Sequence, residues 1–159
     1  MIFVTVGSQM PFDRLILGAD SWCQSHPSAR VIAQIGDSKL TPAAMETYRT
    51  LPPQRFTALL AEADIVVSHA GMGTIISAAE FRKPLVLLPR RGALRETRND
   101  HQVATVNWLR TKPGIFVADD ESVLPDAIDA ALRSKDAFDA APTSREIMVD
   151  RLRKLIQSL

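Results

Sequence analysis

The sequence is poor in cysteine and contains no long apolar run. Its only cysteine, Cys23, has no partner for an internal disulfide, so nothing indicates an oxidising compartment. The longest apolar runs, such as residues 84–89, are strand-sized and far below the roughly 20 residues that span a bilayer. The first ten residues lack the basic and apolar segments of a signal peptide. We therefore expect a cytoplasmic protein that reaches any membrane through another molecule.

Charge of one sign and repeated glycines are also missing. Lysine and arginine total 19 against 18 acidic residues, and the net charge of +1 gives no basis for sequence-independent nucleic-acid binding. The segment Gly7-Ser8-Gln9 lacks the repeated glycines of a dinucleotide fingerprint, which argues against a dehydrogenase or methyltransferase. The 159 residues contain no internal repeat and are 46% hydrophobic, which fits one domain with a substantial core.

What is present is an alternation of short apolar runs with segments of helical spacing. The runs predict strands at 2–6, 31–35, 64–68, 85–88 and 114–117; helical spacing occurs at 12–22, 56–63, 75–81, 100–109, 122–132 and about 143–158. Residues 38–53 are punctuated by proline and admit a short helix and an edge strand near 47–51. Alternating strands and helices predict a parallel sheet covered on both faces. We expect one Rossmann-like, doubly wound α/β domain over residues 1–159.

Two predicted loops follow strands and carry glycine. In an open parallel sheet, ligands bind beyond the carboxyl ends of the strands, where Gly7-Ser8-Gln9 and the loop 69–74 both emerge. Glycines at 71 and 73 would leave backbone N–H groups open to an anion, with the dipole of the next helix behind them and a hydroxyl on Thr74. A glycine pair at such a turn is as often a packing solution as a phosphate site, and both interpretations stay open.

A carboxylate follows at helical spacing. Glu80 lies seven residues after Gly73, nearly two helical turns, which places it on the same face about 10 Å along the axis. There it would accept hydrogen bonds from ribose hydroxyls while a diphosphate sits on the loop. The alternative is a solvated glutamate paired with Arg82 or Lys83.

A charged loop over residues 89–102 separates a predicted buried strand from a helix, and loops of this kind often carry function. Its arginines at 90, 91, 95 and 98 would neutralise phosphates or a sugar carboxylate. Asp100 and Gln102 suit the hydroxyls of a sugar. The alternative is a solvated loop in which Asn99 or Asp100 caps the following helix.

Three segments in this order resemble the C-terminal, donor-binding domain of the family 28 glycosyltransferases. They read VTVGSQMPFDRLI, ADIVVSHAGMGTIISAAEFRKPLVLLPR and NDHQVATVNWL, within residues 1 to about 110. Within the family the chain is most similar to stand-alone donor subunits, such as the small subunit of the dolichol-linked N-acetylglucosaminyltransferase pair and those of bacterial exopolysaccharide synthesis. The shared hallmarks are Ser68–Gly73, Pro89-Arg90 and Asp100-His101-Gln102.

The resemblance implies half of a GT-B fold, a UDP-sugar donor and inverting transfer to a lipid-linked acceptor, without metal or other cofactor. By position, the resemblance implies a diphosphate site lined by Gly7, Ser8, Gly71, Gly73 and Thr74. It implies that Glu80 binds the ribose and that Asp100 and Gln102 hold the donor sugar. Met72 and Arg90 are also expected among the donor-binding residues. The resemblance implies a binding or loop-structural role for His69, whose imidazole would at most assist catalysis. Phe56 would border the uracil ring or belong to the core.

The family places its acceptor site and general base in an N-terminal domain, and this sequence begins at the donor domain. We therefore expect a membrane-anchored partner subunit to supply that half, and we assign no catalytic residue here. The expected function is the donor subunit of a two-component transferase, in exopolysaccharide synthesis, at the inner face of the membrane. The helix at about 143–158 would pack on this partner or on its own sheet.

Two other functions remain open at this point: a nucleotide-sugar-binding scaffold without turnover, and a UDP-sugar epimerase, whose chemistry also uses a GT-B scaffold. The sequence does not decide whether the donor carries glucuronate, glucose or N-acetylglucosamine. Arg90, Arg91 and Arg95 suit a uronic acid, but a diphosphate alone would explain them.

Overall fold

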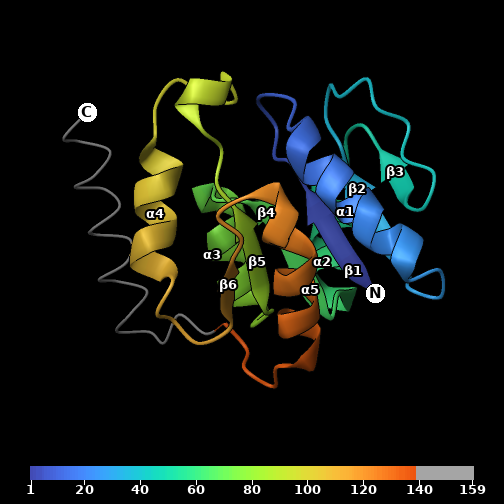
Figure 1. Cartoon of the computed structure of the whole chain (residues 1–159). Helices are drawn as coiled ribbons and strands as arrows, with labels where there is room; N and C mark the ends of the chain where they lie inside the picture. Colours follow the sequence, from blue (N-terminus) through green and yellow to red (C-terminus); the bar gives the residue numbers. More distant parts are fainter. Residues whose placement is uncertain (139–159) are drawn as a thin grey trace.

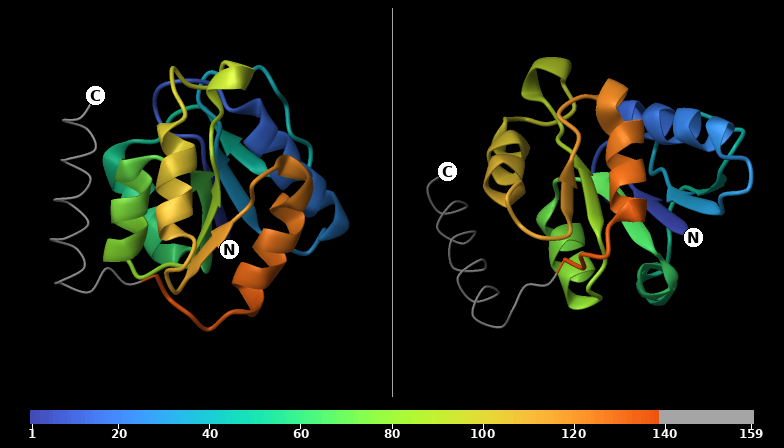
Figure 2. Two further views of the ribbon diagram at one scale, coloured as in Figure 1. Left: turned by 60° about the vertical axis from the view of Figure 1, so that its left-hand side comes forward. Right: turned by 60° about the horizontal axis from the view of Figure 1, so that its bottom comes forward.

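The computed structural model describes residues 1–138 and has a six-stranded, all-parallel sheet between two layers of helices (Figures 1 and 2). The strands are β1 (Ile2–Thr5), β2 (Val31–Gln34), β3 (Glu46–Tyr48), β4 (Ile65–His69), β5 (Leu85–Leu88) and β6 (Ile115–Val117). Their order across the sheet is β3-β2-β1-β4-β5-β6. This is the doubly wound order in which the chain reverses direction across the sheet next to β1.

The helices are α1 (Asp13–Ser25), α2 (Pro53–Glu62), α3 (Met72–Glu80), α4 (His101–Leu109) and α5 (Leu124–Arg133). Two single 3₁₀ turns, η1 (Gly92–Leu94) and η2 (Glu121–Val123), lie in the connections after β5 and β6. Among residues 1–138, no helix is long and apolar enough to cross a membrane.

Each face of the sheet carries its own core because alternate residues of a strand point to opposite sides. On one face, Val4 packs in a cluster with buried residues of α1 and α5, including Ile16 and Ile128. On the other face, Phe3 packs in a cluster with α2, α3 and α4, including Ile75. All residues of β1 and β5 are buried, which explains why these strands are continuous apolar runs and not alternating ones.

The central pair of strands positions the site. β1 and β4 are parallel neighbours, with Thr5 opposite Ser68, although 63 residues separate them in the chain. The segments that follow them, from Gly7 and from Ala70, therefore leave the same edge of the sheet side by side. The connection from β5 to α4 emerges at that edge one strand further along.

The predicted α/β architecture is confirmed, with the main differences at element ends. In the proline-punctuated stretch the strand β3 is found, but residues 38–53 contain no short helix before α2 begins at Pro53. Helix α3 starts at Met72, three residues before the predicted start, so Gly73 lies in its first turn. The helix predicted at about 143–158 lies outside the described residues.

Candidate functional site

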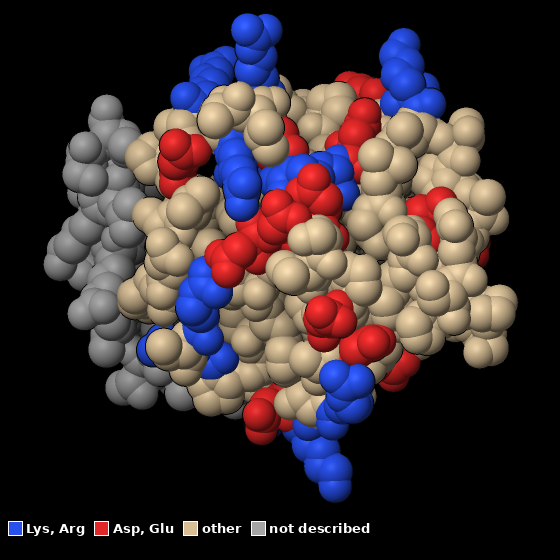
Figure 3. Space-filling model, viewed as in Figure 1, with Lys and Arg blue, Asp and Glu red and all other residues tan. Residues whose placement is uncertain are grey.

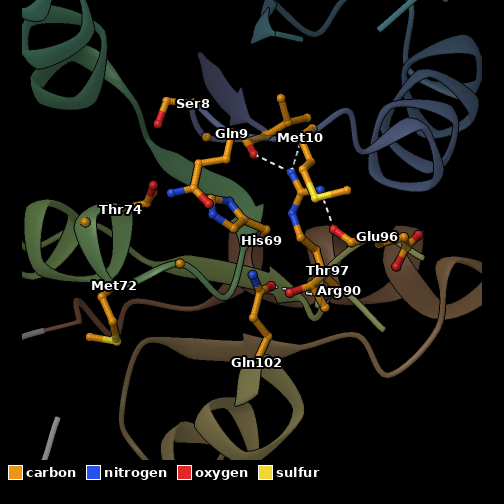
Figure 4. A pocket seen from close by; sticks show the side chains of 14 residues that line it. Ser8, Gln9, Met10, His69, Met72, Thr74, Arg90, Glu96, Thr97 and Gln102 are labelled. Atoms are coloured by element: carbon orange, nitrogen blue, oxygen red, sulfur yellow. Dashed lines mark hydrogen bonds between the residues drawn. The ribbon is translucent and has the colours of Figure 1, made fainter. Parts of the chain in front are cut away.

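Two adjoining cavities lie beyond the carboxyl ends of β1 and β4. The first has a volume of about 330 Å³ and is shown in Figure 4; it is lined by Val6–Met10, His69, Gly71–Thr74, Arg90, Glu96, Thr97 and Gln102. The second, of about 480 Å³, extends over β2 and is lined by Thr5, Gly7–Met10, Gln34, Gly36, Asp37, Thr50, Leu51, Phe56, Gly73, Thr74 and Ser77. The residues common to both come from the loop after β1 and the first turn of α3, which form the junction of the cavities.

The imidazole of His69 lies between the two glycine loops and explains two of the glycines. A Cβ added at Gly7 would lie 2.5 Å from Cε1 of His69, and one added at Gly71 would overlap Nε2. Gly7 also has a φ of +78°, which favours glycine by itself. Nδ1 of His69 lies 3.2 Å from the hydroxyl oxygen of Ser68. The ring thus acts as a spacer between the loops after β1 and β4.

The position of His69 also determines its charge. Burial, assisted by the positive charge of Arg90, lowers its pKa from 6.5 to about 4, although a hydrogen bond to the backbone of Thr5 opposes the shift. At pH 7 the ring is therefore neutral. It can exchange hydrogen bonds with a ligand but adds no positive charge to the cavity.

The N-terminus of α3 points its backbone donors at the junction of the cavities. Gly71 is the N-cap, and no side chain caps the first turn. The first N–H groups of a helix have no intrahelical acceptor and sit at the positive end of its dipole. A Cβ added at Gly73 would meet nothing within 4 Å, in contrast to Gly71. Gly73 therefore keeps the approach to these donors open, which is the geometry of an anion site.

Arg90 lines the first cavity but directs its guanidinium at the protein backbone. The side chain is 4% exposed. Its Nη2 donates to the carbonyl oxygens of Val6 (2.8 Å) and Met10 (2.6 Å). Its Nη1 donates to those of Pro11 (2.8 Å) and Glu96 (3.1 Å). The sequence assigned this arginine to phosphate, whereas the structure places four of its five N–H groups on carbonyls, with desolvation lowering its pKa.

A second arginine fixes the far wall of the cavity. Arg14 of α1 binds the Glu96 carboxylate with Nε and Nη2, both at 2.9 Å, and donates to Glu121 and to the carbonyl of Pro89. Glu96 also accepts from the backbone N–H of Arg91. These bonds hold the loop after β5 against α1, on the face where Figure 3 shows acidic and basic side chains interspersed. The Glu96 carboxylate is thereby engaged at both oxygens.

Within the segment Asp100-His101-Gln102, Gln102 lines the first cavity and Asp100 does not. Oε1 of Gln102 accepts from the backbone N–H groups of Ala70 (3.2 Å) and Arg90 (3.0 Å), which ties the β4 loop to the end of β5. The amide stands at the floor of the first cavity (Figure 4), where its nitrogen remains available to a ligand. Asp100 instead accepts from the backbone N–H of Gly92 (2.8 Å) and lines neither cavity. The donor-sugar role predicted for both residues is therefore supported by position only at Gln102.

In helix α3 as well, the residue predicted at the site lies outside the cavities and another residue lines one of them. Glu80 is exposed, forms the last residue of the helix and lines neither cavity, because seven residues carry it about 10 Å beyond Gly73. Ser77, one turn after Gly73, lines the second cavity instead. The i, i+4 spacing would have identified Ser77 from the sequence. Phe56 lines the second cavity and packs edge-on against Phe3 of the core, at a ring separation of 5.3 Å.

Sequence reasoning placed Gly7, Ser8, His69 and residues 71–74 at one site, and the structure brings all of them to the first cavity. Gln9, which follows Gly7 and Ser8 in the loop after β1, also lines this cavity, whereas Val6, Met10, Glu96 and Thr97 were not predicted as lining residues. Nothing in the types or spacing of these four distinguishes them from other residues; three of them, Val6, Met10 and Glu96, are bonded to Arg14 or Arg90, which the sequence does not reveal.

Comparison with known families agrees with this geometry. The glycosyltransferase family 28 C-terminal domain matches residues 1–158. The chain belongs to this family. The resemblance inferred from the three sequence segments is thus confirmed, and the loops that carry it are the walls of the cavities.

Curated proteins similar to the chain include a eukaryotic transferase subunit and a bacterial transferase. The human UDP-N-acetylglucosamine transferase subunit ALG13 is 32% identical over 130 residues, covering 72% of this chain and 11% of the relative. A Prochlorococcus marinus (strain MIT 9215) UDP-N-acetylglucosamine--N-acetylmuramyl-(pentapeptide) pyrophosphoryl-undecaprenol N-acetylglucosamine transferase is 24% identical over 107 residues, covering 65% and 28%. The chain therefore spans a minor part of the length of these relatives.

Solved structures support the same fold. The NMR structure of ALG13 superposes with a TM-score of 0.64 at 19% identity, covering 95% of this chain and 93% of that one. Methanocaldococcus jannaschii UDP-GlcNAc 2-epimerase gives a TM-score of 0.61 at 13% identity, covering 97% and 45%. At these identities the likeness concerns the fold alone.

Proposed function

We propose that this family 28 domain binds the UDP-sugar donor of an inverting glycosyltransferase. The observation that carries the proposal is the junction of the two cavities at Gly73 and Thr74, where the uncapped start of α3 faces the loop after β1. The diphosphate would lie on these N–H groups. The second cavity, with Phe56, Leu51 and Ser77, would take the nucleoside, and the first cavity would take the sugar beside Gln102.

The chemistry proposed for this domain is stabilisation of the leaving UDP. Displacement at the anomeric carbon builds negative charge on the diphosphate, and preorganised donors at the start of α3 would offset that charge. The acceptor hydroxyl must also lose a proton to a general base. Glu96 is engaged by Arg14, and His69 is buried between two glycines, so we assign neither as the base. The base would come from outside the described residues.

We further propose a membrane-anchored partner that supplies the acceptor site and this base, and a lipid-linked acceptor in exopolysaccharide synthesis. The name of the human relative describes it as a subunit, and that of the Prochlorococcus relative includes an undecaprenol-linked substrate. The domain would then work at the inner face of the membrane through its partner. The proposed transfer uses no metal, and activity abolished by EDTA would contradict this part.

The binding step is tested by titrating UDP into the ¹⁵N-labelled chain, with ADP as the matched control nucleotide. We expect amide shifts at Gly7–Met10 and Met72–Thr74 with UDP and much weaker ones with ADP, because both carry a diphosphate but differ in the base. Absence of these shifts with UDP would end the proposal. Equal shifts with ADP would reduce it to a general diphosphate site.

The catalytic step requires the chain together with its partner and a panel of donors carrying glucuronate, glucose or N-acetylglucosamine. Sugar transfer to a lipid-linked acceptor is the expected result. UDP binding without transfer to any acceptor would instead support a scaffold, and an epimerised donor formed without acceptor would support an epimerase.

A further inference from the structure

Arg90 connects segments that are far apart in the chain. Its guanidinium donates to Val6, Met10 and Pro11 in the loop after β1 and to Glu96 in the loop before α4. One face of the guanidinium lies over the ring of Phe12, 4.6 Å from the ring centroid. Figure 4 shows the side chain running along the wall of the first cavity toward Met10.

The backbone of the same residue extends this connection to the third loop. The N–H of Arg90 donates to Oε1 of Gln102, which also accepts from the N–H of Ala70 after β4. All three loops that form the first cavity are therefore joined through Arg90 and Gln102. Within the described residues, every hydrogen-bond acceptor of the Arg90 guanidinium is a backbone carbonyl. The planar group with its five donors is therefore matched to carbonyls and not to an anion.

We propose that Arg90 is a positioning residue: it sets the separation of the loop after β1 from the loop before α4, and so the orientation of the backbone donors that face the diphosphate. This rests on the proposed UDP-sugar site and deepens it. The carbonyls of Val6 and Met10 accept from Arg90, and the segment Gly7–Met10 lines both cavities, so these bonds fix the path of a loop that forms the cavity wall. Without the guanidinium, four carbonyls lose their donors and the loop loses its fixed path.

The test compares UDP affinity of the full chain with Arg90 unchanged, Arg90→Lys and Arg90→Gln. A positioning role requires the planar fork, so both variants should bind UDP about tenfold more weakly, corresponding to one or two misplaced donors. Circular dichroism must show the variants folded at the temperature used. Their amides at residues 7–11 should shift in the absence of ligand, whereas those of α5 should not.

The matched control is Arg110→Gln, which removes the same charge from an exposed arginine paired with Asp119 outside both cavities. It should leave UDP affinity unchanged. If Arg90→Lys kept the affinity of the unchanged chain while Arg90→Gln lost it, Arg90 would be acting through its charge, and the inference would be overturned. A loss of thermal stability with unchanged affinity would also overturn it.

A measurement on the unchanged protein covers the case in which the variants do not fold. The guanidinium resonances of Arg90 should be protected from exchange and should move little at saturation with UDP. Large shifts there would indicate direct contact with phosphate and overturn the inference. Failure of the unchanged chain to bind UDP would instead reject the proposed function, and the ligand-free amide shifts in Arg90→Lys would still report on positioning.

Discussion

At the scale of single residues, the glycines of the SHAGMG segment have different reasons to be glycine. Gly71 has an ordinary φ of −88°, so its backbone would accept a side chain, but His69 occupies the space where Cβ would be. Gly73 has open space in that direction. Packing explains the glycine at 71, whereas Gly73 leaves open space, so the phosphate-site interpretation stays a prediction that depends on Gly73.

This difference predicts opposite effects of alanine. Gly71→Ala should destabilise the fold by about 1–3 kcal/mol because the imidazole must move. Gly73→Ala should stabilise it by up to ~1 kcal/mol through helix propensity and yet weaken UDP binding, because the methyl group enters the approach to the helix donors. Urea unfolding and UDP titration of both variants provide the check. If Gly71→Ala is made together with His69→Ala, part of the loss should be recovered; additive losses would show that the ring is not the obstacle.

The neutral state of His69 predicts how stability depends on pH. Its folded pKa of about 4 lies below the unfolded value of 6.5, so between these values the unfolded chain binds more protons. The contribution is fully present above pH 6.5 and is lost as the pH falls toward 4, by up to about 3 kcal/mol. Urea unfolding at pH 7.0, 5.5 and 4.5 should show this decline in the unchanged chain and a smaller one in His69→Gln. Equal slopes would mean that His69 is not the group responsible.

The roles of these residues were only partly predictable from sequence. Glycine at 71 and 73 predicted an exposed backbone, but the contact between Gly7, His69 and Gly71 exists only because β1 and β4 pair. Arg90 was predicted to bind phosphate because a loop arginine near glycines usually faces an anion. Its burial against backbone carbonyls depends on the path of a loop 80 residues earlier, which no local pattern encodes.

At the scale of elements, helix α3 determines which of its side chains line the proposed nucleotide site. The seven-residue spacing from Gly73 predicted Glu80 as a site residue, whereas in the structure Ser77, one turn after Gly73, lines the second cavity. The strands were easier to predict, because fully buried parallel strands are continuous apolar runs bounded by polar or glycine residues. Strand β3, with three partly exposed residues at the sheet edge, has no such run.

A pair of substitutions on α3 tests this assignment. Ser77→Leu should fill part of the second cavity and weaken UDP binding at least about tenfold, since a displaced nucleoside loses its apolar contact and hydrogen bonds. Glu80→Gln should change the UDP dissociation constant by less than about twofold. Isothermal titration calorimetry of both variants gives the comparison. A large loss in Glu80→Gln would restore the ribose contact first inferred from the sequence.

At the scale of the whole molecule, basic residues are not concentrated around the two cavities. In the described part of the chain, Arg90 is the one lysine or arginine that lines either cavity, and its donors face carbonyls. On the face shown in Figure 3, basic and acidic side chains are interspersed. The diphosphate would therefore be held mainly by neutral N–H and O–H donors at short range.

If neutral donors hold the diphosphate, the affinity for UDP should depend only weakly on the salt concentration. Raising NaCl from 50 to 500 mM should weaken UDP binding by less than about threefold, because short-range hydrogen bonds are screened less than exposed charge pairs. Fluorescence or calorimetric titrations across this range would measure the slope. A decrease of tenfold or more would show that exposed arginines, such as Arg95 or Arg98, contact the phosphates directly.

The pairing of β1 with β4 also has a consequence for how the chain acquires its binding site. One wall follows Thr5 and the other follows Ser68, and the intervening segment contains two further strands, β2 and β3. A nascent or truncated chain that ends before β4 would thus have only the loop after β1 and would lack the second wall of the proposed nucleotide site. A nucleotide bound at the proposed site could therefore stabilise the domain only once β1 and β4 have paired.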